Sequence, residues 1–130
     1  MFEELRAVFE ADPRIGYAVV FGSTVTGTAH AESDVDVAIG TTGTVPLGVI
    51  DLGTLASALD AAAGRHVDLV LLDEAPPGLA YRVFRDGRTI FARDRRALGA
   101  RRARAVLEYL DFRPVEELCA RAVLTASHGR

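Results

Sequence analysis

The stretch FGSTVTGTAHAESDVDVAIG, residues 21–40, places a glycine–serine pair after one apolar run and two aspartates at the head of the next. Residues 15–21, IGYAVVF, are β-branched and aromatic, and they predict a buried strand that ends at Gly22. Residues 35–40, VDVAIG, predict a second strand. Carboxylates at the start of a strand that enters the core need a cation or strong donors beside them, so this stretch raises the possibility of a site at the sheet.

The rest of the chain alternates between helical and extended patterns. Helices are predicted over residues 2–11, 51–64 and 79–87, and further strands over 66–72 and 88–93. Asp51 is expected to cap the start of the second helix and Gly64 to end it. From residue 94 to about 126 the pattern is helical, with a break expected near Pro114. The order predicts an α/β (α+β) fold, a mixed sheet of about four strands flanked by helices, with strand 88–93 near a sheet edge and a C-terminal helical tail.

Length and composition limit the class of protein. The 130 residues predict a single domain over 1–130, with a core over about 15–93 and C-terminal helices over about 94–126. No apolar run reaches the roughly 18 residues of a membrane span, so no membrane association is expected. The single cysteine, Cys119, cannot form an intrachain disulfide, which is typical of a cytoplasmic location. Cys119 lies in an apolar helical stripe, and a core or interface position is expected for it.

Charge is distributed unevenly along the chain. Residues 1–92 carry 13 acidic residues against 6 arginines, and residues 93–130 carry 9 arginines against 5 acidic residues. A basic tail on an acidic body predicts either contact with an anionic partner or a solvated helix face with ion pairs, and the sequence leaves both open.

Asp34 and Asp36 form the first part of a candidate site. Side chains two residues apart on a strand project from the same face, so the two carboxylates are expected together, with Val35 and Val37 on the other face. Carboxylate oxygens suit a hard divalent ion such as Mg²⁺, which takes one or two carboxylates together with substrate phosphates. The alternative is a turn in which Asp34 is a cap and Asp36 is exposed.

Asp68 is the third candidate metal ligand. It lies inside HVDLVLL, residues 66–72, where a lone buried carboxylate would cost several kcal/mol. If this strand neighbours 35–40, three acids meet at one sheet edge in an arrangement suited to two-metal phosphoryl or nucleotidyl transfer, with Asp68 as general base or metal ligand. His66 begins the same strand and is expected on the surface.

Gly22 and Ser23 are the candidate nucleotide-binding residues. A glycine after a strand lets a phosphate approach the backbone, and the serine adds a hydroxyl and a main-chain N–H. Taken alone, the pair is equally consistent with an ordinary turn at the end of a strand. His30, in the loop that follows, is expected to be a solvated loop residue, although it could approach a nucleotide.

The spaced motif resembles a known family. Gly22-Ser23, then Asp34-Val35-Asp36, then a third acid in a later strand, is similar to the DNA polymerase beta nucleotidyltransferase superfamily. The short chain and the segment VLEYLDFRPVEE, residues 106–117, resemble the minimal nucleotidyltransferases (MNT), antitoxins that are partners of HEPN-domain ribonuclease toxins. The resemblance implies a nucleotidyltransferase fold and a hetero-oligomer with a HEPN toxin.

The resemblance also implies a reaction. Such proteins use ATP and Mg²⁺ to transfer AMP to a tyrosine hydroxyl of the partner toxin, which silences it in a type VII-like toxin–antitoxin pair. By this resemblance Asp34, Asp36 and Asp68 are the catalytic and metal-binding residues. One departure is that Thr24 and Thr26 stand where many relatives carry arginines, which removes positive charge near the phosphates of the nucleotide.

Other functions remain as alternatives. The chain could be a non-catalytic module that neutralises a toxin by docking through its apolar tail and the arginines of residues 93–104. A transferase that modifies a small molecule such as an antibiotic is disfavoured, because no second domain is available to enclose the substrate. Direct nucleic-acid binding is not expected, since a separate strand-gripping domain is also lacking.

Overall fold

A computed structural model describes residues 1–22, 34–43 and 47–128 of the chain. The elements in order are α1 (Phe2–Glu10), β1 (Ile15–Phe21), β2 (Val35–Thr41), α3 (Val49–Ala63), β3 (Val67–Leu71), the 3₁₀ turn η1 (Leu72–Glu74), α4 (Pro77–Asp86), β4 (Arg88–Ala92) and α5 (Arg95–His128). Every strand predicted from the sequence is present, with ends that agree within one residue.

The four strands form one mixed sheet in the order β3-β2-β1-β4. Strand β1 pairs antiparallel with both β2 and β4, whereas β2 pairs parallel with β3. A parallel pair needs a crossover connection, and α3 supplies it between β2 and β3. The mixed sheet flanked by helices is therefore confirmed, as is the position of β4 at an edge.

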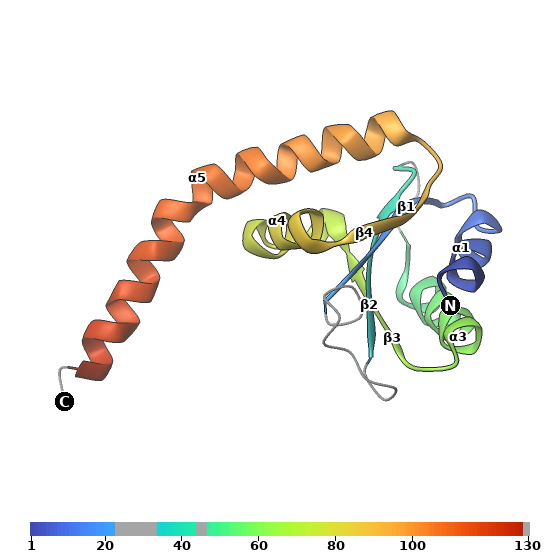
Figure 1. The fold of residues 1–130 in the computed structure, drawn as a ribbon, viewed down its shortest axis with the longest axis horizontal. Coiled ribbons are helices and arrows are strands. Elements are labelled where there is room, and N and C mark those ends of the chain that lie inside the picture. Colours follow the sequence, from blue (N-terminus) through green and yellow to red (C-terminus); the bar gives the residue numbers. More distant parts are fainter. Residues whose placement is uncertain (23–33, 44–46, 129–130) are drawn as a thin grey trace.

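Helices cover both faces of the sheet (Figure 1). Helices α1 and α3 pack on one face, where Leu5, Phe9 and Leu59 meet Val35 and Val37 in one buried cluster. On the other face α4 and the first turns of α5 form a second cluster, which includes Tyr17, Val19, Ala38, Leu72, Val83, Phe84 and Ala105. Each buried aliphatic side chain contributes about 1.5–3 kcal/mol to stability, so the two clusters hold the sheet rigid between them.

Helix α3 begins earlier than predicted. Its first residue is Val49, and Asp51 is the third residue of the helix rather than the cap before it. The Asp51 carboxylate accepts a hydrogen bond from the backbone N–H of Gly48 at 3.1 Å and lies 2.9 Å from the Arg14 guanidinium. Asp51 therefore stabilises the start of the helix from inside its first turn. At the other end Gly64 has a φ of 71°, as expected for the residue that ends the helix.

Helix α5 corrects two predictions. It runs without interruption through Pro114, where a break was expected, and Figure 1 shows it changing direction partway along its length. A proline removes one helical hydrogen bond, and the flanking turns can continue with a bend. Cys119 is exposed, because this part of α5 projects away from the sheet, so a core position is excluded and the interface position expected as the alternative stays a prediction. None of the described helices is long and apolar enough to cross a bilayer.

Gly40 generates a stability prediction. An added Cβ at Gly40 would overlap the ring of Tyr17, its partner on β1, which is only 5% exposed. We expect Gly40→Ala to lower the free energy of unfolding by about 1–3 kcal/mol, measured by urea denaturation, because the ring has no space to move into.

Gly53 provides the matched control. It lies on the exposed side of α3, and a Cβ there would meet no atom within 4 Å. Gly53→Ala should therefore raise stability by about 0.5–1 kcal/mol, through helix propensity alone. Equal stability of wild type and Gly40→Ala would contradict the packing of Tyr17 against Gly40.

Candidate active site

The pairing of β2 with β3 brings the candidate carboxylates together. Asp36 and Asp68 are register partners in the parallel pair, and Asp34 lies immediately before β2. Alternation along β2 directs Val35 and Val37 into the buried cluster under α1 and α3, which leaves Asp36 on the opposite face. The three acids therefore share one end of the sheet, formed by the first residues of two neighbouring strands.

Asp68 is less buried than its sequence context predicted. Its side chain is 49% exposed, so the expectation of a carboxylate inside a buried strand is wrong. The reason is that β3 is an edge strand and Asp68 is its second residue. Asp36, on the inner strand β2, is the more buried of the two.

Gly22 lies against the Asp36 carboxylate. Strand β1 ends at Phe21, the register partner of Asp36, and Gly22 follows with a φ of 79°. A Cβ at Gly22 would stand 2.5 Å from Asp36 Oδ2. Glycine is thus required twice here, by the left-handed backbone and by the approach of the carboxylate. Ser23 and His30 lie outside the described residues.

The electrostatics of the site disfavour the ionised form of Asp36. Burial raises the pKa of Asp36 above its ordinary value, and the negative charges of Asp68 and Asp34 raise it further. Like charges in a shared site act in this way when no cation neutralises them. The acids are therefore arranged so that a bound cation would relieve their mutual repulsion.

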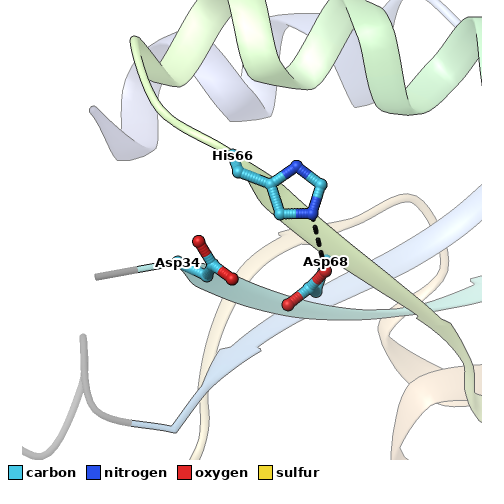
Figure 2. Close-up of side chains that lie close together, drawn as sticks. All are labelled: Asp34, His66 and Asp68. Atoms are coloured by element: carbon cyan, nitrogen blue, oxygen red, sulfur yellow. Dashed lines mark hydrogen bonds and ion pairs between the residues drawn. The ribbon is translucent and has the colours of Figure 1, made fainter. Parts of the chain in front are cut away.

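His66 is the site residue that sequence reasoning missed. Its side chain is 58% exposed, as expected for a surface residue, but its Nε2 lies 2.8 Å from Asp68 Oδ1 (Figure 2). The hydrogen bond to Asp68 is the main cause of a raised pKa of His66. The spacing could have revealed this contact, because residues 66 and 68 are two apart in an extended segment and so share a face.

Three side chains converge closely enough to share one metal ion. Asp34, His66 and Asp68 each offer one ligand atom, and these atoms all lie within 4.8 Å of one another. Figure 2 shows the side chains of Asp34, His66 and Asp68 close together. Carboxylate oxygen and imidazole nitrogen are both ordinary ligands of divalent ions, so the donor set fits a cation.

Residues 3–96 match the protein family described as Polymerase beta, Nucleotidyltransferase. The matched residues make up more than half of the chain. No curated protein matches the chain.

Several solved structures share the fold. A toxin–antitoxin structure with AMP-PNP superposes with a TM-score of 0.81 at 22% identity, over 95% of this chain and 98% of that one. An MNT antitoxin in complex with a tri-AMPylated HEPN toxin from Shewanella oneidensis gives a TM-score of 0.73 at 19% identity, over 95% and 99% of the two chains. A candidate minimal nucleotidyltransferase is 30% identical over 66% of this chain and 88% of that one, with a TM-score of 0.56.

The repulsion at Asp36 generates a pH-dependent prediction. In metal-free buffer at neutral pH, Asp36→Asn should be more stable than wild type, because the variant removes a carboxylate whose ionisation the folded state disfavours. The folded pKa is raised, so ionisation costs wild type stability as pH rises through that pKa. The gain should therefore shrink as pH falls through the raised pKa and disappear below the ordinary value of 3.8, where the folded and unfolded states both hold the proton.

Urea denaturation of the two proteins across this pH range measures the difference. A variant that is less stable than wild type at neutral pH would show that the Asp36 carboxylate is not repelled by its neighbours.

Proposed function

The chain belongs to the Polymerase beta nucleotidyltransferase family, and from that premise we propose that it transfers AMP from ATP to a hydroxyl group of a HEPN-domain toxin. The acceptor is a tyrosine, the reaction depends on Mg²⁺, and the modification makes this chain the antitoxin of the pair. The observation that carries the proposal is the register pairing of Asp36 with Asp68, beside Asp34 and Gly22. The structure with AMP-PNP and the complex with a tri-AMPylated toxin support the choice of ATP as the nucleotide and of a HEPN toxin as the protein that is modified.

In this proposal the three acids share the binding of metal, and Asp68 has a second task. Asp34, Asp36 and Asp68 would hold the Mg²⁺ ions, which when bound neutralise the carboxylates and the charge that develops on the phosphates. Asp68, the most accessible position on the edge strand, would accept the proton of the acceptor hydroxyl. Gly22 and Ser23, which follow β1, would hold the triphosphate. At position 22 a residue with a Cβ would collide with the Asp36 carboxylate.

The proposed reaction is a single displacement at the α-phosphorus. The hydroxyl oxygen forms a bond to that phosphorus, and the bond from it to the oxygen that bridges the α- and β-phosphates breaks. Pyrophosphate leaves with that oxygen, and the hydroxyl proton passes to Asp68. The product is an AMP ester of the partner.

A second candidate function is neutralisation by docking alone. The observation that favours it is the row of exposed apolar side chains on α5, at Leu107, Leu110 and Leu118, on the helix that leaves the body of the protein (Figure 1). Such a face could bind a partner without any chemistry. The absence of arginines at positions 24 and 26 is compatible with this candidate as well.

AMP transfer should depend on Asp36. We expect Asp36→Asn to lower the rate of AMP transfer about a thousandfold, equivalent to about 4 kcal/mol of transition-state stabilisation. The measurement is labelling of a HEPN partner from ATP labelled at the α-phosphate. Asp86→Asn is the matched control, because Asp86 lies on α4 in an exposed pair with Arg85 and should label at the wild-type rate.

Wild-type labelling by Asp36→Asn would rule out the proposed role of the carboxylates. Experiments in cells that carry the toxin distinguish neutralisation by docking from neutralisation by catalysis. If Asp34→Asn combined with Asp36→Asn still protects them, binding is sufficient, whereas loss of protection by a stably expressed double variant supports catalysis.

A further inference from the structure

The imidazole of His66 lies between two carboxylates, one within hydrogen-bond distance and one beyond it. Its Nε2 lies 2.8 Å from Asp68 Oδ1, and its Nδ1 lies 3.7 Å from Asp60 Oδ1. Asp60 belongs to α3 and Asp68 to β3, so the ring lies across the junction of the helix with the strand that follows it. One ring nitrogen faces the candidate metal site and the other faces away from it.

Asp60 is fixed in place by the backbone. Its Oδ1 accepts a hydrogen bond from the N–H of Val67 at 2.7 Å, and Val67 is buried at the start of β3. A carboxylate on the far nitrogen of a histidine is the usual partner of a metal-ligating imidazole, because it orients the ring and makes the free nitrogen a better ligand. Asp60 lies on that side of the His66 ring, and its Oδ1, at 3.7 Å, would have to come closer to Nδ1 to accept a hydrogen bond from it.

A simple ion pair between His66 and Asp68 does not account for Asp34. Asp34 comes from a separate segment, before β2, yet it brings a ligand atom within 4.8 Å of those of both His66 and Asp68. A single imidazole cannot pair fully with two carboxylates and also face a third at Asp60. A divalent cation among the three ligand atoms would satisfy Asp34 and Asp68 together and leave Asp60 to His66.

We propose that His66 is a protein ligand of the metal site, through Nε2, together with Asp34 and Asp68. The nitrogen ligand makes the site favour a divalent transition ion over Mg²⁺, because imidazole suits ions such as Zn²⁺, Fe²⁺ and Ni²⁺ whereas Mg²⁺ is bound mainly through oxygen. Mn²⁺, which binds to both oxygen and nitrogen, serves as the probe of this preference. The use of this metal in AMP transfer rests on the proposed function, but its binding does not. The carboxylates alone contain no nitrogen donor, so the preference for a transition ion over Mg²⁺ depends on His66.

The test uses the full-length, metal-free protein without ATP or partner, at about pH 8, where an ordinary imidazole is neutral. Isothermal titration with Mn²⁺ and with Mg²⁺ gives the two affinities, and electron spin echo measurements on bound Mn²⁺ report directly coordinated nitrogen. We expect Mn²⁺ to bind at least about tenfold more tightly than Mg²⁺, with a nitrogen coupling present.

His66→Gln replaces the nitrogen with an amide oxygen at a similar reach. It should weaken Mn²⁺ binding about tenfold or more, remove the nitrogen coupling and change Mg²⁺ binding by less than about twofold. His128→Gln removes a different histidine and serves as the matched control, with wild-type values expected for both metals.

Two results would overturn the proposal. One is Mn²⁺ affinity of His66→Gln within about twofold of wild type, and the other is bound Mn²⁺ without nitrogen coupling. Neither result would contradict the proposed Mg²⁺-dependent transfer of AMP from ATP. Conversely, nitrogen-coordinated Mn²⁺ in a protein that labels no HEPN partner with either metal would defeat the proposed function and support the role of His66.

Discussion

The parallel pairing of β2 with β3 is the constraint on which the site depends. It fixes the register in which Asp36 faces Asp68, and it exists because α3 carries the chain back across one face of the sheet. Val35, Val37 and Val67 hold that register by burying one face of both strands. A slip of one residue would move the carboxylates into the apolar cluster, so the packing of the core and the position of the acids cannot be separated.

Unfavourable electrostatic and backbone interactions are concentrated at the same end of the sheet. The pKa of Asp36 is raised by burial and by two neighbouring charges, and Gly22 keeps a left-handed backbone pressed against the same carboxylate. Repulsion and unusual backbone that persist together in a stable structure are typical of binding and catalytic sites. Asp51 shows the opposite arrangement, because its carboxylate is stabilised by the N–H of Gly48 and by the Arg14 guanidinium.

Sequence patterns predicted the sheet well because its strands are short, β-branched runs with clear ends, as in IGYAVVF at β1. Alternation on a strand predicted one face for Asp34 and Asp36, whereas the approach of Asp68 to them depended on the pairing of its strand with β2. Sequence patterns failed where tertiary position decides the outcome. The exposure of Asp68 depends on β3 being an edge strand, and the approach of Asp60 to 3.7 Å from His66 depends on how α3 meets β3.

The proposed activity of the carboxylates at this end of the sheet is transfer of AMP to a partner protein. Intact-mass analysis of a HEPN-domain partner co-expressed with this chain tests it most directly, because it reads the product without assuming the acceptor residue or the metal. We expect the mass of the partner to be increased by one or more AMP units. A partner that is recovered in complex with the wild-type chain, is neutralised, and has an unmodified mass would contradict it.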